Sequence, residues 1–131
     1  MTVALESVSV MVIDDNDFIR EAVSVMLTDI GFREIAQARD GNDGLRQLEK
    51  VNPGLIICDV SMKPMDGFSF VEALRQQSWA GAARVPVIFL TVHTENAIVK
   101  KAVKLGVKAY VVKPVQKKQL EARILTVLEN T

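Results

Sequence analysis

The sequence has one cysteine, one histidine and no long apolar run, and each shortage excludes a class of protein. Cys58 alone cannot form an intramolecular disulfide framework, and His93 alone cannot supply the usual histidine-rich zinc site. No apolar run approaches the roughly 20 residues of a membrane span, and the N-terminus has no basic segment followed by an apolar core. Without repeats, low-complexity stretches or linkers rich in glycine and proline, residues 1–131 are expected to form one cytoplasmic domain.

The composition is that of a folded globular chain whose charges are unevenly distributed. Hydrophobic residues make up 49 % of the 131 residues, charged residues 24 %, and the mean hydropathy is +0.19. The 16 basic and 16 acidic side chains cancel, which argues against nucleic acid and membrane surfaces as partners. Residues 1–66 nevertheless carry 12 acidic and 6 basic side chains, whereas residues 67–131 carry 4 acidic and 10 basic ones. The basic second half favours a partner with an acidic protein surface.

Five short apolar runs alternate with amphipathic stretches along the chain. Buried strands are predicted at 8–13, 35–38, 55–58, 85–90 and 109–112. Helices are predicted over 17–30, 43–51, 68–77, 94–105 and 116–129, because apolar residues recur there at helical spacing. Asp17 and Thr94 are the expected N-caps, and Asp40-Gly41-Asn42 is the expected turn. Strands that alternate with helices and are apolar on both faces predict an open, doubly wound parallel α/β sheet.

Ligands of such sheets bind beyond the carboxyl ends of the strands, and polar residues occupy those positions here. The residues at these ends are Asp14 and Asp15, Asp59, Thr91 and Lys113. Two carboxylates 4 Å apart repel by roughly 1–4 kcal/mol, so a hard cation such as Mg²⁺ is expected among them. An Asp carboxylate is also a nucleophile toward phosphorus, and a metal, a lysine and a hydroxyl together stabilise phosphoryl oxygens. All the parts that phosphoryl transfer to an aspartate requires are therefore present at these strand ends.

In this order and at these separations, the five residues resemble the receiver domain of two-component response regulators. Met62 and Met65-Asp66-Gly67, which follow Asp59, also match the family pattern. The resemblance covers essentially the whole chain and implies a five-stranded (βα)5 fold, flavodoxin-like and CheY-like, with strand order 2-1-3-4-5. It implies that Asp59 accepts a phosphoryl group from a sensor histidine kinase or a phosphotransfer protein. A conformational switch would then signal to a protein partner.

The same resemblance implies a metal site. Mg²⁺, or Mn²⁺ in its place, is expected to be bound directly by Asp15, by Asp59 and by the backbone carbonyl of Ser61. Asp14 is expected to act mainly through a metal-bound water.

The remaining roles implied by the resemblance fall in the second half of the chain. Lys113 is expected to pair with the phosphoryl oxygens, and the Lys113-Pro114 bond is expected to be cis. Thr91 is expected to donate its hydroxyl to the phosphate, which would draw its loop inward. Tyr110, three residues before Lys113, matches the aromatic residue whose rotation signals that movement.

The sequence also departs from the family pattern beyond the phosphoacceptor. Lys63 stands where a proline is usual and Pro64 follows it, which preserves the loop length but puts the local backbone geometry in question. Ser61 and His93 lie two residues beyond the phosphoacceptor and the threonine, at positions that border the phosphoryl group in the family. We hypothesise that this pair sets the lifetime of the phosphorylated state.

Residues 94–130, from Thr94 through the last helix, are the expected readout surface. Nothing follows Thr131, so no output domain is expected. The chain would act by binding another protein, as the chemotaxis members do, as a carrier in a phosphorelay, or as a receiver excised from a longer protein. It is expected to be a monomer or a dimer that forms on phosphorylation. Its only expected chemistry is its own phosphorylation and autodephosphorylation, so it is not expected to be an enzyme.

Other functional classes share parts of this pattern. A Mg²⁺-dependent phosphatase with an aspartyl-phosphate intermediate typically has a second Asp two residues after the nucleophile, where this chain has Ser61. A nucleotide-binding domain is disfavoured because neither G-x-x-x-x-G-K-[ST] nor G-x-G-x-x-G occurs. A flavin binder is disfavoured by the acidic segment after the first strand, which would repel the flavin phosphate. A constitutive binding module that is never phosphorylated stays open.

Overall fold

A computed structural model describes residues 4–78 and 81–130, which form one parallel sheet flanked by helices. The strands are β1 (Ser9–Ile13), β2 (Glu34–Ala38), β3 (Leu55–Asp59), β4 (Val87–Thr91) and β5 (Ala109–Val112). The helices are α1 (Asp17–Ile30), α2 (Gly41–Val51), α3 (Gly67–Arg75), α4 (Asn96–Lys104) and α5 (Lys117–Glu129). The strand order is β2-β1-β3-β4-β5, which confirms the predicted doubly wound sheet. The expected domain ends, Met1 and Thr131, lie outside the described residues.

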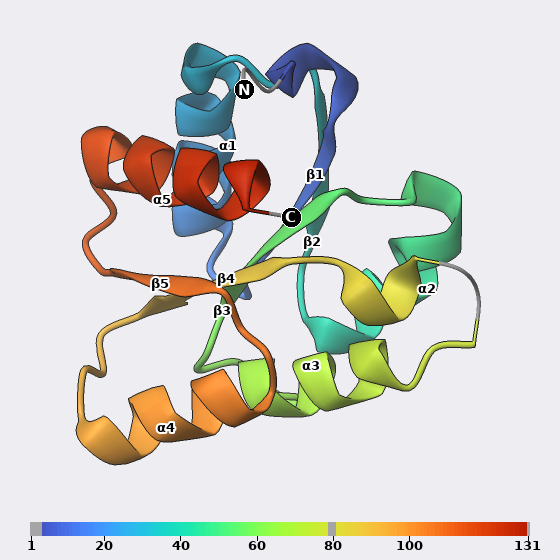
Figure 1. Ribbon diagram of the computed structural model, residues 1–131, viewed down its shortest axis with the longest axis vertical. Helices are drawn as coiled ribbons and strands as arrows, with labels where there is room; N and C mark the ends of the chain where they lie inside the picture. Colours follow the sequence, from blue (N-terminus) through green and yellow to red (C-terminus); the bar gives the residue numbers. More distant parts are fainter. Residues whose placement is uncertain (1–3, 79–80, 131) are drawn as a thin grey trace.

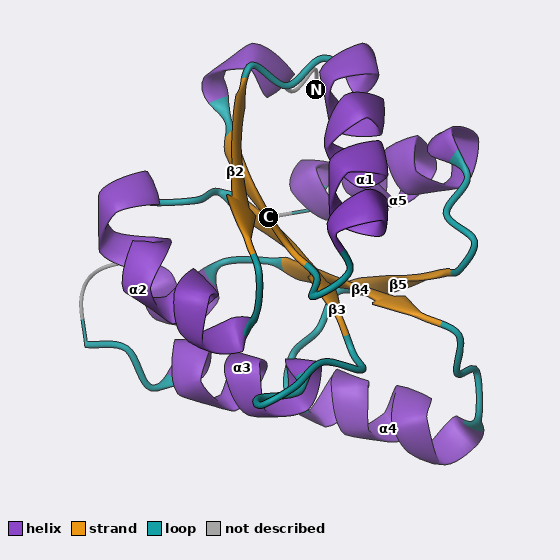
Figure 2. Cartoon of the chain, turned by 180° about the vertical axis from the view of Figure 1, so that it is seen from behind, coloured by secondary structure: helices purple, strands orange, loops and turns teal. Residues whose placement is uncertain are grey.

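The sheet separates two apolar cores because successive strand residues point to opposite faces. Helices α1 and α5 cover one face, and α2, α3 and α4 cover the other (Figures 1 and 2). The core beneath α1 and α5 includes Val10, Val12, Ile57, Ile88, Leu90, Val23, Leu27, Leu120 and Ile124. The core beneath the other three helices includes Met11, Ile13, Ile56, Cys58, Phe89, Leu48, Phe70, Leu74 and Ala102. Every residue of β3 and β4 is buried, as expected for central parallel strands.

Three expected local features differ in the structure. Helix α1 is capped by Asn16, whose side chain accepts the Ile19 N–H at 2.9 Å, so the expected cap at Asp17 is wrong. Helix α2 begins at Gly41 after an Asp40 cap, so the expected turn there is the first turn of the helix. The residue before α4 is Glu95 rather than Thr94, and its side chain makes no capping bond. Several neighbouring polar residues are suitable N-caps, and the backbone conformation before the helix decides which side chain reaches the free N–H groups of the first turn.

Among residues 4–78 and 81–130, no helix combines the length and the apolar character needed to cross a membrane.

Gly67, the first residue of α3, lets the loop after β3 return closely to its own strand. A Cβ at this position would lie 2.6 Å from the Asp59 carbonyl oxygen and 2.9 Å from the Val60 Cα. The Gly67 N–H also donates to the Val60 carbonyl at 2.8 Å. Because both obstacles are backbone atoms, no side-chain rotation relieves the contact, and the loop that carries the end of β3 depends on this glycine.

Replacing Gly67 with alanine is expected to lower the free energy of unfolding by about 2 kcal/mol, the scale of an overpacked contact. Gly44→Ala is the matched control, because its Cβ would lie 2.7 Å from the Ile13 Cδ1, the flexible end of a side chain. Helix propensity favours alanine by about 1 kcal/mol, so Gly44→Ala is expected to stay within about 1 kcal/mol of the original protein. Urea unfolding measures both changes, and equal losses in the two variants would contradict the backbone argument.

Candidate functional site

The register of the sheet brings the predicted strand-end residues to one edge. Ile13 lies opposite Cys58, so the next residues along the two strands, Asp14 and Asp59, are neighbours. Thr91 at the end of β4 lies opposite Val112, and the residue after Val112 is Lys113. The Lys113 N–H donates to the Thr91 carbonyl at 2.9 Å, which extends the ladder by one step. Residues that are far apart in the sequence therefore lie together at the edge formed by the carboxyl ends of the strands.

A cavity of about 340 Å³ opens at this edge. Its lining residues are Asp14, Asp15, Asn16, Ile19, Asp59, Ser61, Val92 and Lys113. Sequence reasoning found five of these and missed Asn16, Ile19 and Val92. Their closeness in the sequence to the predicted site residues could have indicated them, because Asn16 and Ile19 belong to the first turn after Asp15 and Val92 directly follows Thr91. Among the described residues, the lining includes neither Thr91 nor His93.

Three carboxylates gather in the cavity. One oxygen from each of Asp14, Asp15 and Asp59 lies within 4.8 Å of the other two. Asp14 is 0 % exposed and Asp59 is 5 % exposed, whereas Asp15 faces solvent. With all three ionised and one lysine beside them, the cluster carries two uncompensated negative charges. Oxygen donors of this kind suit a hard divalent cation such as Mg²⁺, so the residues fit an acidic metal site.

Lys113 lies between two of these carboxylates. Its Nζ is 3.1 Å from Asp59 Oδ1 and 3.3 Å from Asp14 Oδ2, and the side chain is mostly buried. Burial lowers the pKa of Lys113, but the hydrogen bond to Asp59 and the charges of Asp14 and Asp59 outweigh it and raise the pKa. The lysine is therefore a fixed positive charge in the site.

The surroundings of Asp59 disfavour the ionised form of its carboxyl group. Burial raises its pKa above the ordinary value, and the neighbouring Asp14 charge raises it further, while Lys113 lowers it only in part. The Ser61 N–H lies 3.4 Å from Asp59 Oδ1, too long for a strong hydrogen bond. The Asp59 carboxylate thus depends on positive charge for its ionised form.

Thr91, His93 and Tyr110 are not among the residues that line the cavity. Thr91 is buried, and its Oγ1 accepts the His93 N–H at 2.8 Å and lies 3.3 Å from the His93 carbonyl. The His93 Nδ1 is 3.5 Å from the Glu95 Oε1 on the following loop. Tyr110 on β5 is 38 % exposed. In this state, the Thr91 hydroxyl is therefore engaged with its own loop.

Two X-Pro bonds in the described ranges 4–78 and 81–130 are cis. Lys113-Pro114 is cis, as the sequence resemblance implied. Lys63-Pro64, where the sequence departs from the family pattern, is also cis. Ser61 still lines the cavity, so the altered loop preserves that part of the site.

The chain is similar to known regulators in sequence. A family model described as the response regulator receiver domain matches residues 10–125. The transcriptional regulatory protein AfsQ1 of Streptomyces coelicolor is 38 % identical over 122 residues, which are 93 % of this chain and 52 % of that protein. The chemotaxis protein CheY of Treponema pallidum is 32 % identical over 122 residues, which are 92 % of this chain and 82 % of that protein. The chain spans about half the length of the transcriptional regulators that it matches.

The likeness extends to solved structures. The chemotaxis protein CheY4 of Vibrio cholerae has a TM-score of 0.84 and 33 % identity, with 92 % of this chain and 98 % of that chain covered. A response regulator of Chloroflexus aurantiacus has a TM-score of 0.83 and 25 % identity, with 93 % and 98 % covered. Both likenesses extend over nearly the whole of each chain.

The raised pKa of Asp59 predicts how stability varies with pH in the absence of divalent cations. Because the folded protein binds the Asp59 proton more tightly than the unfolded chain does, the free energy of unfolding falls as pH rises above the ordinary value of 3.8. Asp59→Asn removes the ionisable carboxyl group and with it this fall in the free energy of unfolding. At pH 7 in a metal chelator, the variant is expected to be more stable by on the order of 1 kcal/mol, the usual scale of a single substitution. The difference should shrink toward pH 3.8 in unfolding experiments.

Asp43→Asn is the control of opposite sign. Burial raises the pKa of Asp43, but hydrogen bonds from the Arg39 N–H and the Gln47 and Arg46 side chains outweigh it and lower the pKa. Its ionised form therefore stabilises the fold above the unfolded pKa, and the variant should be less stable than the original protein at pH 7. A stability gain for Asp59→Asn that did not vary with pH would contradict the account.

Proposed function

This chain belongs to the response regulator receiver domain family of two-component systems, and we propose that its Asp59 accepts a phosphoryl group from a phosphohistidine of a sensor histidine kinase or phosphotransfer protein. The observation that carries the proposal is the gathering of three carboxylates around Lys113 at the carboxyl edge of the sheet. Its chemistry would be limited to its own phosphorylation and autodephosphorylation. A single receiver domain over these residues and a cytoplasmic location stay predictions.

The carboxylate cluster supports Mg²⁺, or Mn²⁺, as the cofactor. Asp15, Asp59 and the backbone carbonyl of Ser61 would hold it directly, and Asp14 would act through a water. One oxygen from each of the three carboxylates lies within 4.8 Å of the other two, which is close enough for the group to surround one cation. When bound, the cation would supply positive charge that offsets the charge on the transferring group.

Phosphoryl transfer would use Asp59 as the nucleophile. An oxygen of its carboxylate forms the bond to phosphorus as the bond from phosphorus to the donor imidazole nitrogen breaks. Lys113 favours the ionised nucleophile through its 3.1 Å contact. Once phosphorus is attached to Asp59, the Lys113 Nζ would pair with a phosphoryl oxygen in place of the carboxylate.

Thr91 would convert this event into a change of shape. Its hydroxyl now accepts the His93 N–H, and it would instead donate to a phosphoryl oxygen. The loop after β4 would follow the hydroxyl inward and favour another position of Tyr110, which is half-exposed on β5. Phosphorylation would thus shift the population between two arrangements rather than create a new one.

The 94–130 face would read out the switch to a protein partner. A hollow of about 340 Å³ on this face is lined by residues of α4, the loop that follows it, β5 and α5; they include the basic Lys108 on that loop and Arg123 on α5. Val103 and Tyr110 line the same hollow and are exposed large apolar side chains. This mixture suits a partner that offers acidic and apolar side chains, or a second phosphorylated copy of the chain.

Incubation with Mg²⁺ and acetyl phosphate is expected to attach one phosphate to each chain. The product should be an acyl phosphate, sensitive to hydroxylamine, and it should be absent in Asp59→Asn. Asp66→Asn is the matched control, because Asp66 caps α3 and asparagine preserves that capping. Intact-mass measurement counts the phosphate on each chain.

The two alternative functions give different results in the same assay. Release of many phosphates by each chain would identify the phosphatase, whose acyl phosphate turns over. No incorporation in the presence of Mg²⁺ would identify a constitutive binding module and would contradict the proposal.

Ser61 and His93 are proposed to set the lifetime of the phosphorylated state. Ser61 lines the cavity beside Asp59, whereas His93 is bonded to Thr91 through its N–H and would move with it. Ser61→Asn and His93→Ala are expected to change the rate of phosphate loss several-fold, equivalent to about 1 kcal/mol in the barrier. Asp66→Asn, which leaves Ser61, His93 and the contact between His93 and Glu95 in place, is the control. Unchanged decay of the phosphorylated protein in both variants would contradict the proposal.

A further inference from the structure

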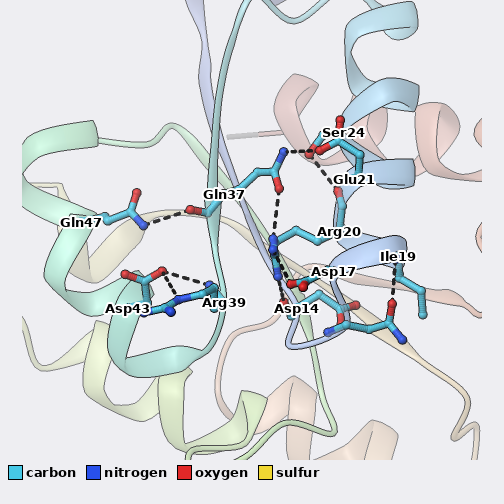
Figure 3. Close-up of polar contacts among 11 residues, drawn as sticks. Asp14, Asp17, Ile19, Arg20, Glu21, Ser24, Gln37, Arg39, Asp43 and Gln47 are labelled. Carbon is cyan, nitrogen blue, oxygen red and sulfur yellow. Dashed lines mark hydrogen bonds and ion pairs between the residues drawn. The ribbon is translucent and has the colours of Figure 1, made fainter.

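Arg20 lies behind the wall of the acidic cavity, at the end of the first turn of α1. Its side chain is only 12 % exposed, and its guanidinium donates in three directions. Nη1 donates to the main-chain carbonyl of Asp14 at 2.8 Å, Nη2 to the Asp17 Oδ1 at 2.7 Å, and Nε to the Gln37 Oε1 at 3.0 Å (Figure 3). A planar guanidinium holds such a set of acceptors in one fixed geometry.

The bond to the Asp14 carbonyl completes the restraint of that residue. The Asp14 N–H donates to the Ala38 carbonyl at 3.2 Å, and its Oδ1 accepts the Asn16 N–H at 2.9 Å. Its Oδ2 lies 3.3 Å from the Lys113 Nζ. Because the peptide group is planar, fixing the Asp14 carbonyl also fixes the orientation of the N–H and Cα of Asp15. Arg20 therefore sets the direction in which both acidic side chains leave the backbone.

The charge of Arg20 is directed away from the site. Its ion pair in the described part of the chain is with Asp17, and none is found with the carboxylates of Asp14, Asp15 or Asp59. Arg20 also does not line the cavity. Its action on the site thus passes through the backbone carbonyl, while the negative charge of the cluster stays available to a cation.

We propose that Arg20 is a positioning residue: by holding the Asp14 carbonyl, it orients Asp14 and Asp15 and so raises the affinity of the acidic cavity for a divalent cation. This inference rests on the proposed function for the identity of the ligand. Residues that orient metal-binding carboxylates from behind typically contribute 10–100-fold in affinity.

The sign of the change separates this role from a simple effect of charge. Removing a positive charge near an acidic cluster strengthens cation binding, whereas releasing the Asp14 peptide weakens it. Arg20→Met loses both the charge and the hydrogen bonds. Arg20→Lys keeps the charge but loses the planar set of donors. Positioning therefore predicts weaker binding in both variants, and charge alone predicts tighter binding in Arg20→Met with no change in Arg20→Lys.

The test is calorimetric titration of the full chain with Mg²⁺, without a phosphodonor. Both Arg20 variants are expected to bind Mg²⁺ roughly 10-fold more weakly than the original protein. Arg46→Met and Arg46→Lys are the matched controls, because Arg46 makes the same i, i+3 pair, with Asp43 at 2.9 Å, on the surface of α2. Their Mg²⁺ affinity should be unchanged.

A second measurement needs no metal. The Asn16 amide, which donates to the Asp14 Oδ1, is expected to exchange its hydrogen faster in both Arg20 variants when the protein is held in a chelator. In the titration with Mg²⁺, Gln37→Met is a further control. It removes the third acceptor of Arg20 but leaves the hydrogen bond to the Asp14 carbonyl, so it should retain most of the Mg²⁺ affinity. Urea unfolding verifies that each variant is folded, and Arg20→Lys alone carries the test if Arg20→Met does not fold.

Three results would overturn the inference. These are unchanged affinity in the Arg20 variants, tighter binding in Arg20→Met, or a loss in Gln37→Met as large as that in Arg20→Lys. In each of these cases the original protein still binds Mg²⁺ and is phosphorylated, so the proposed function survives. Failure of the original protein to bind Mg²⁺ would instead overturn the proposed function.

Discussion

Three carboxylates converge at one edge of the sheet, with a single ammonium group between two of them. Two of these carboxylates, Asp14 and Asp59, are buried, and burial makes their mutual repulsion stronger than it would be in water. Lys113, through contacts of 3.1 and 3.3 Å, offsets part of that repulsion. The arrangement therefore favours the binding of additional positive charge, such as that of a divalent cation.

The sheet is what makes this unfavourable arrangement possible. Its central strands are buried on both faces, so the packing energy of two apolar cores holds the strand ends in place. Gly67 adds a close return of the chain beneath Asp59, and Arg20 adds a restraint behind Asp14. The stability of the domain thus comes from the cores, whereas the charged edge is maintained for its chemistry.

Much of the architecture follows from local sequence patterns. The apolar run at 10–13, rich in β-branched residues, indicates a strand from its own composition. The alternation of such runs with amphipathic helices then favours a parallel sheet over other sheet types. The ends of the helices were less predictable. Asn16 and Asp17 are both good caps; the structure uses Asn16, whose backbone is extended, and Asp17 is the first helical residue and pairs with Arg20. Helix α4 starts at Asn96 without a side-chain cap, which no capping pattern could indicate.

The sequence by itself determined which residues stand at the strand ends, because a polar residue after a buried run marks the point where a strand leaves the core. It therefore identified Asp14, Asp15, Asp59 and Lys113 as candidates. Tertiary structure alone decided the rest: the contact between Lys113 and Asp14 joins residues 99 positions apart, and the place of Val92 rather than His93 in the cavity wall depends on the course of one loop. The hold of Arg20 on the Asp14 carbonyl likewise depends on backbone geometry, since a hydrogen bond to a carbonyl leaves no trace in the identity of the accepting residue.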